Sequence, residues 1–145
     1  MKCPKCKAYI PMTRSEASHR HYFAAIREAY NNLPERVTME WWTQSAEHLR
    51  KYALIKTGHC DRSVLHLASP DACLAAAIQL RQRDKYSEVT IQDNMLSWST
   101  AHSQQLNAMG KKDFERSKED VLGFLADLLG VSKQHLLDAS EQHAI

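Results

Sequence analysis

The feature that most constrains the fold is a change of hydrophobic period along the chain. In residues 13–33 and 113–130, apolar side chains recur every three or four positions, which predicts two amphipathic α-helices. In residues 63–68 and 88–98 they alternate with polar ones, which predicts strands, with Asp93-Asn94 as the turn of a hairpin. A chain that combines both periods is expected to cover a small sheet with helices.

Capping residues mark three further helices. Ser45 precedes a helical pattern that ends before Gly58, and Ser69-Pro70 begins another that ends near Lys85. A short last helix follows Ser132. The expected order is helix, helix, strand, helix, hairpin, helix, helix. This order predicts an α+β fold with a small, mostly antiparallel sheet packed with about five helices.

Two regions are expected along the chain. Residues 1–12 form an N-terminal segment with a CPKC motif, and residues 13–145 form a single α+β domain. Residues 8–12 are candidates for an additional edge strand, because Pro11 restricts them to an edge.

Composition and charge narrow the functional classes. The chain has 43% hydrophobic and 25% charged residues, typical of a globular protein rather than a disordered one. No apolar run approaches the ~20 residues of a membrane span, and the N-terminus has no apolar signal core, so we expect no membrane partner and a cytoplasmic location. Residues 1–60 carry a net charge of +5 and residues 61–145 a net charge of −3. The basic half suits a polyanion.

Basic side chains gather at the start of the first helix, where stability does not favour them. The helix dipole prefers anions at this end, so cations there fit a bound phosphate. A solvated basic face is the alternative interpretation. The candidate DNA-binding residues of this helix are Arg14, His19, Arg20, His21 and Arg27, the histidines contributing when protonated.

Aromatic and basic residues also lie close together around the second helix. Bases stack on aromatic faces with roughly 1–3 kcal/mol each, without sequence preference. Trp41 and Trp42 are adjacent, so one of them is expected to point outwards as a stacking platform while the other packs in the core. The candidate phosphate-binding cations here are Arg50, Lys51 and Lys56.

The cysteines permit a zinc site without specifying one. Cys3 and Cys6 have the spacing of half a zinc knuckle. The remaining ligands would be Cys60 with His59 or His66, and a free dithiol at the terminus is the alternative. No other cofactor is expected.

Catalytic motifs are missing from the sequence. It has no glycine-rich phosphate loop among its four glycines, and neither GxSxG nor HExxH occurs. The aspartates stand at caps and turns, where they belong structurally. We therefore expect a protein that is not an enzyme.

The opening helix resembles a group of phage-encoded proteins, the NinB/Orf-like recombination family, which includes phage proteins of unknown function. The resemblance lies in the Arg14-Ser15 pair, the block Ser18–Ala24, and Ser103 followed by Met109 and Phe114. It implies an α+β homodimer that binds single-stranded DNA without catalysis. It also implies a phage or prophage genome and a host recombination or single-strand-binding protein as a further partner.

Three hypotheses follow from the sequence. The first is a phage recombination accessory protein that binds single-stranded DNA through the basic residues of the first two helices. The second is a phage protein that occupies a host protein through an acidic surface. The third is a small zinc-containing DNA-binding regulator. The acidic surface would include Glu115, Glu119, Asp120 and Asp127.

Overall fold

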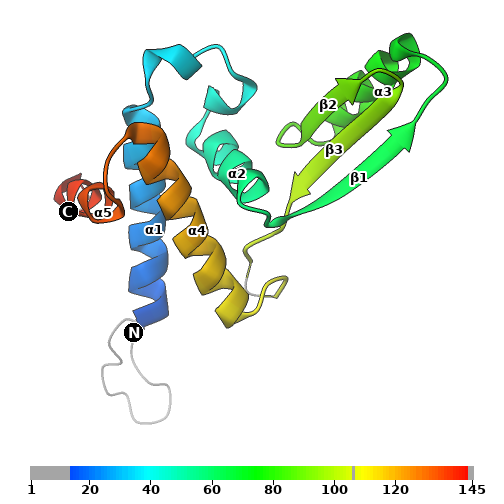
Figure 1. The fold of residues 1–145 in the computed structure, drawn as a ribbon. Helices are drawn as coiled ribbons and strands as arrows, with labels where there is room; N and C mark the ends of the chain where they lie inside the picture. The colour runs from blue at the N-terminus through cyan, green and yellow to red at the C-terminus, as the bar shows by residue number, and fades with distance from the viewer. Residues whose placement is uncertain (1–13, 106, 144–145) are drawn as a thin grey trace.

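The computed structural model describes residues 14–105 and 107–143 and shows two parts of one α+β domain (Figure 1). One part, the helical layer, packs α1 against α4 and α5, and α2 against α1 and α4. Two short 3₁₀ turns, η1 (Glu35–Val37) and η2 (Trp41–Thr43), join α1 to α2. The helices of this layer are α1 (Arg14–Asn31), α2 (Ala46–Lys56), α4 (Lys111–Leu129) and α5 (Lys133–His143).

The other part, the sheet unit, comprises residues 60–101 and is inserted between α2 and α4. Its three strands have the order β1-β3-β2, and both neighbouring pairs are antiparallel. The outer strands therefore run parallel to each other, and the connection between them contains α3, which packs on β2 and β3. Its elements are β1 (Cys60–His66), α3 (Pro70–Arg83), β2 (Glu88–Gln92) and β3 (Met95–Ala101).

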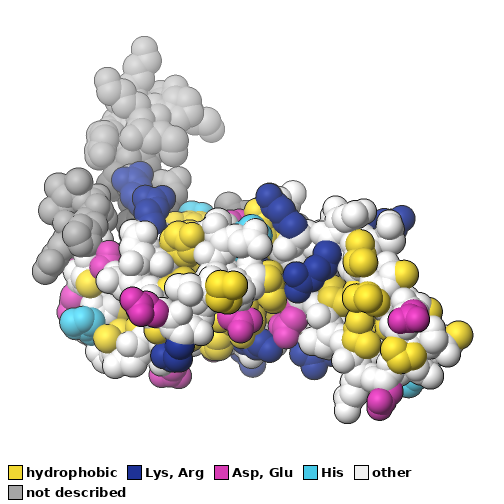
Figure 2. All heavy atoms as spheres, turned by 90° about the horizontal axis from the view of Figure 1, so that it is seen from above, with side chains coloured by type: hydrophobic (Ala, Val, Ile, Leu, Met, Phe, Trp, Pro, Cys, Tyr) yellow, Lys and Arg dark blue, Asp and Glu magenta, His cyan; other side chains and the backbone are white. Residues whose placement is uncertain are grey.

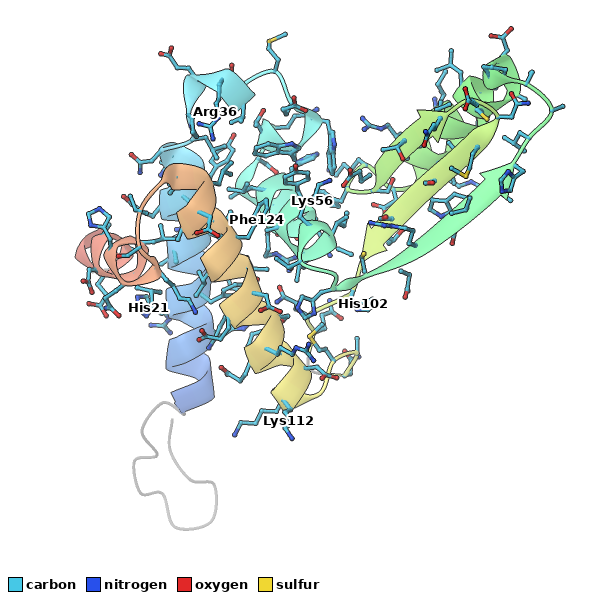
Figure 3. All side chains as sticks on the ribbon, viewed as in Figure 1. His21, Arg36, Lys56, His102, Lys112 and Phe124 are labelled. Atoms are coloured by element: carbon cyan, nitrogen blue, oxygen red, sulfur yellow. The ribbon has the colours of Figure 1, made fainter. Side chains whose placement is uncertain are left out.

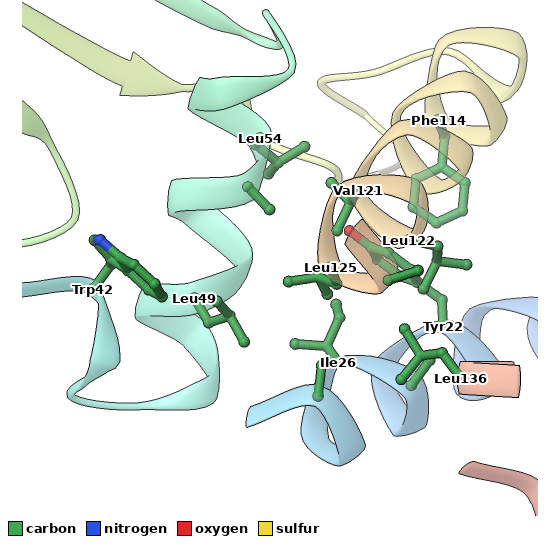
Figure 4. Packing of buried hydrophobic residues seen from close by; sticks show 14 of the residues in the cluster. Tyr22, Ile26, Trp42, Leu49, Leu54, Phe114, Val121, Leu122, Leu125 and Leu136 are labelled. Carbon is green, nitrogen blue, oxygen red and sulfur yellow. The ribbon is translucent and has the colours of Figure 1, made fainter. Parts of the chain in front are cut away.

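The two parts have separate hydrophobic cores. The larger core joins the four helices of the helical layer, and Figure 4 shows Leu125 of α4 close to Ile26 of α1 and Leu49 of α2. The smaller core lies between α3 and the sheet and contains only three buried residues, Cys73, Ala77 and Leu96. Most of the buried apolar surface therefore belongs to the helical layer, which supplies most of the stability.

Local sequence explains the helix boundaries. The hydroxyl oxygens of Ser45 and Ser69 each accept a hydrogen bond from a backbone N–H in the first turn of their helix, at 3.1 Å. Gly130 ends α4 with a φ of 72°, a left-handed conformation that glycine adopts without steric cost. Gly58, with a φ of 90°, turns the chain from α2 into β1.

The predicted fold class and helix order are confirmed, with shifts at the strand ends. β1 begins at Cys60 and β3 continues to Ala101, because these two residues pair in the sheet. The alternating pattern begins only at residue 63, since the first part of this edge strand carries polar side chains. The CPKC motif and the proposed edge strand at residues 8–12 lie outside the described residues. In the part of the chain that the structure describes, no helix has the length and apolar character needed to cross a membrane.

The packing predicts a clear difference between two leucines. Leu125 is fully buried, whereas Leu65 on β1 is 44% exposed. Leu125→Ala should lower the free energy of unfolding by about 2–5 kcal/mol, because it leaves a cavity among three helices. Leu65→Ala should cost well under about 1 kcal/mol. Urea unfolding followed by circular dichroism measures both, and equal losses would contradict the burial described here.

Candidate nucleic-acid interface

The predicted basic face of α1 is partly used for packing. The His19 ring stacks on Phe114 with 5.4 Å between ring centroids and contacts the edge of Phe23 at 4.7 Å. Arg20 and Arg27 are exposed. The side chain of Arg14 lies outside the described part of the structure. Of this set, Arg20 and Arg27 are the described cations available for an anion.

His21 faces a different neighbour from the cations of α2. Its Nε2 lies 3.2 Å from the carbonyl oxygen of Leu137 and 3.8 Å from a carboxylate oxygen of Glu141, both in α5. Figure 3 shows His21 on the α5 side of α1, and Lys56 on the side of α2 that faces the sheet unit. The predicted site residues therefore do not line one common channel.

Arg50, a predicted phosphate contact, points into the protein. Its Nη1 donates to Oε1 of Gln104 at 2.6 Å, and its Nε donates to Glu47 at 3.0 Å. The guanidinium carbon lies 5.5 Å from the ring centre of Phe23. Burial alone would raise the pKa of Glu47, but the hydrogen bond and charge of Arg50 hold it below its ordinary value. The Arg50 side chain therefore has a structural role, because its hydrogen bonds are made within the protein.

A network of buried polar side chains extends from Arg50. The Tyr22 hydroxyl donates to the same oxygen of Gln104 at 3.0 Å, and the Gln104 amide donates to Ser117 at 2.8 Å. Burial raises the pKa of Tyr22 to about 12, so its hydroxyl stays protonated as a donor. The network joins α1, α2 and α4 to the chain segment that follows β3.

The other two predicted cations of α2 lie beside the sheet unit. Lys56 donates to Glu88 at 2.9 Å, and its ammonium lies 5.4 Å from the ring centre of Tyr52. Lys51 is half-buried, and burial followed by the charge of Arg50 lowers its pKa. Asp84, before β2, also acts electrostatically on Lys51, which places this lysine where the two parts meet.

The two adjacent tryptophans differ in burial, although both pack against the larger core. Trp42 is 4% exposed and stacks on Tyr52 with 4.4 Å between ring centres and an interplanar angle of 3°. Trp41 is only half-buried. It contacts Tyr52 and His48 through edge contacts at 5.9 and 6.4 Å. Trp41 is therefore the more accessible of the two tryptophans.

Basic residues from the sheet unit complete the surroundings of Trp41. The guanidinium carbon of Arg81 lies 5.4 Å from the Trp41 ring centre, and the Lys85 ammonium lies 5.2 Å from that of Tyr86. Figure 2 shows basic side chains between the helical layer and the sheet unit. We call this region the junction surface and define it by Trp41, Lys51, Arg81, Lys85 and Tyr86.

His48 connects the two sides of the junction surface. Its ring contacts the edge of Tyr86 at 4.7 Å, and its Nδ1 lies 2.7 Å from the Ser45 hydroxyl. Burial, and then the charge of Lys85, lower the pKa of His48 below its ordinary value of 6.5. The neutral imidazole therefore fills the space between the aromatic rings at neutral pH.

The candidate zinc ligands that the structure describes either have other partners within the chain or lie too far apart to share an ion. His59 Nε2 lies 2.7 Å from Asp120, and the Cys60 thiol faces the carbonyl oxygen of Ile55 at 3.7 Å. Cys60 and His66 stand at opposite ends of β1, about 20 Å apart at the usual strand rise, which is too far to share one ion. Among residues 14–105 and 107–143, no cluster of three or more potential ligands is present. Cys3 and Cys6 lie outside the described residues.

The predicted acidic surface is largely paired within the chain. Glu115 bonds to Lys118 at 3.0 Å, and Asp120 is the partner of His59. Glu119 pairs with Lys133. Asp127 is exposed.

Comparison with known proteins does not assign this chain to a family. Neither protein-family models, nor curated proteins, nor solved structures match the chain. The resemblance to NinB/Orf-like proteins therefore stays a prediction.

Sequence reasoning missed three residues of the junction surface. Arg81, Lys85 and Tyr86 belong to the end of α3 and the turn before β2, more than 35 residues after Trp41. The local signal was present as a basic run with one aromatic residue, RQRDKY, at residues 81–86. The distance along the chain hid its relation to Trp41.

The geometry predicts that Arg50 and Arg20 differ in their effect on stability. Arg50→Met should lower the free energy of unfolding by about 1–3 kcal/mol, because the buried oxygen of Gln104 keeps only the Tyr22 hydroxyl as a donor and the half-exposed Glu47 loses its ion pair. Arg20→Met, on an exposed position, should change it by less than about 0.5 kcal/mol. Urea unfolding gives both values, and a small loss for Arg50→Met would show that the network is dispensable.

A pH dependence follows from the lowered pKa of His48. As the pH falls, His48 of the unfolded chain becomes protonated near its ordinary pKa of 6.5, whereas in the folded protein it becomes protonated only at a lower pH. The neutral His48 side chain therefore contributes fully to the stability of the fold above pH 6.5, and this stability is lost as the pH falls below that value. Between about pH 7 and 5, His48→Gln should therefore lose less stability than the wild type. Thermal unfolding across this range tests it, and parallel curves for the two proteins would refute the assignment.

Proposed function

We propose that this protein binds single-stranded DNA at the junction surface without catalysing a reaction. The observation that carries the proposal is the arrangement of two cation–aromatic pairs, Arg81 over Trp41 and Lys85 over Tyr86, on neighbouring parts of one surface. Aromatic rings and guanidinium planes stack unpaired bases, and ammonium groups neutralise phosphates.

The arrangement favours single strands over duplexes. Stacking on Trp41 needs a base that is free of its own stack, and a duplex does not offer one. The cations come from α2, α3 and the turn before β2, so a flexible backbone follows them more readily than a stiff duplex. Exposed Arg20 and Arg27 on α1 can add long-range attraction.

A role in phage recombination is the more specific form of the proposal. It is supported by the resemblance of Ser18–Ala24 and the segment around Met109 to NinB/Orf-like proteins. In such a role, the protein would bind a single strand beside a host recombination or single-strand-binding protein.

Replacement of Trp41 tests the proposal directly. Trp41→Ala should weaken binding of a labelled oligothymidylate by about 1–3 kcal/mol, roughly 5- to 150-fold, because one stacking platform is lost. Fluorescence anisotropy measures the affinity. Met39→Ala is the matched control, because this neighbouring side chain is 96% exposed and has no place in the junction surface.

Salt dependence provides the second readout of the same experiment. Lys85→Ala should reduce the slope of log Kd against log salt by about 0.7, since one released counterion is lost from a single-strand complex. Unlabelled single strands should compete better than duplexes of equal length. Absence of binding at low salt, or equal losses for Trp41→Ala and Met39→Ala, would exclude the junction surface as the site.

A further inference from the structure

The outer face of α3 carries a stripe that the sheet does not cover. Its members follow one another at steps of three, four and three residues, the spacing of a helix–helix seam. Leu74 and Ile78 form its centre and are 56% and 51% exposed, while Cys73 and Ala77 face the sheet. The stripe consists of Asp71, Leu74, Ile78 and Arg81.

The two ends of the stripe carry opposite charges. Asp71 lies in the first turn of α3 and Arg81 in its last turn, and both are exposed. Within the described chain, neither is in an ion pair with another residue; Arg81 lies over Trp41 instead. Along the helix, the stripe therefore has a negative residue, two apolar residues and a positive residue. Two such stripes that run in opposite directions are complementary, because each acidic end then meets a basic end.

We propose that α3 pairs antiparallel with α3 of a second copy of this chain. With the two-fold axis near Ala76, Leu74 faces the partner's Ile78, and Asp71 faces the partner's Arg81. Each contact then occurs twice, as in every isologous interface. A parallel pairing would place Asp71 against the partner's Asp71, which like charges disfavour.

The charge pattern favours a second copy over other occupants. The stripe has no net charge, so it does not attract a polyanion as the junction surface does. Its apolar centre lies on the sheet unit, where Figure 2 shows hydrophobic side chains gathered beside the basic ones. A guanidinium can keep one face on an indole and donate its N–H groups in the plane to a carboxylate, so Arg81 can serve both contacts.

The inference is independent of nucleic-acid binding, because the full-length protein is tested alone by sedimentation equilibrium. The wild type should dimerise, and Leu74→Glu with Ile78→Glu should weaken the dimer at least about a hundredfold. Val64→Glu is the matched control. Val64 is 47% exposed, and its neighbour Leu65 pairs with Leu96, which packs against α3. Because adjacent residues of a strand point to opposite faces, Val64 lies on the face away from α3.

A charge exchange tests the register and does not depend on the apolar variants being folded. Asp71→Arg and Arg81→Asp should each weaken the dimer, and the double variant should restore it, because both ion pairs re-form in reverse. Circular dichroism confirms that the variants are folded. The proposal fails if the wild type stays monomeric, including if this face then binds another protein or nucleic acid. It also fails if the exchange gives no rescue, or if Val64→Glu disrupts the dimer as strongly as the Leu74/Ile78 variant.

Discussion

The structure depends on one buried side chain, the amide of Gln104. It lies in the segment between β3 and α4, accepts hydrogen bonds from Arg50 in α2 and Tyr22 in α1, and donates one to Ser117 in α4. A buried guanidinium is tolerated only when its donors find oxygen partners, and Gln104 and Glu47 supply them. The chain leaving the sheet unit is thereby fixed to three helices at once.

Because this anchor holds the end of the sheet unit against the helices, residues of both parts can lie side by side in the junction surface. Trp41 and Lys51 belong to the helical layer, whereas Arg81, Lys85 and Tyr86 belong to the sheet unit. The small core of the sheet unit does not extend into the helical layer, and Ala101 at the end of β3 packs against the larger core, so polar and aromatic contacts supply the rest of the junction. His48 between Trp41 and Tyr86 and the ion pair of Lys56 with Glu88 provide such contacts.

Periodicity and caps were sufficient to predict the order of helices and strands, because both are local properties. They were insufficient for the site, since they give the face of a helix and not the partner that covers it. Arg50 and Lys51 are adjacent cations, yet one is buried against Gln104 and the other borders the sheet unit. Only the long-range position of Gln104 and Asp84 separates their roles. The burial of one tryptophan and the partial exposure of its neighbour agree with the rule that adjacent side chains on a turn diverge.

The path of the chain has a consequence for synthesis on the ribosome. The sheet unit enters and leaves at adjacent points, where the His102 amide donates to the His59 carbonyl at 2.9 Å, so it is a contiguous segment that can close by itself. The helical layer cannot close in this way, because α1 and α2 pack against α4, which begins only at Lys111. In the nascent chain, the apolar sides of the first two helices that α4 covers therefore stay exposed until α4 has been synthesised, an interval in which such surfaces favour aggregation or chaperone binding.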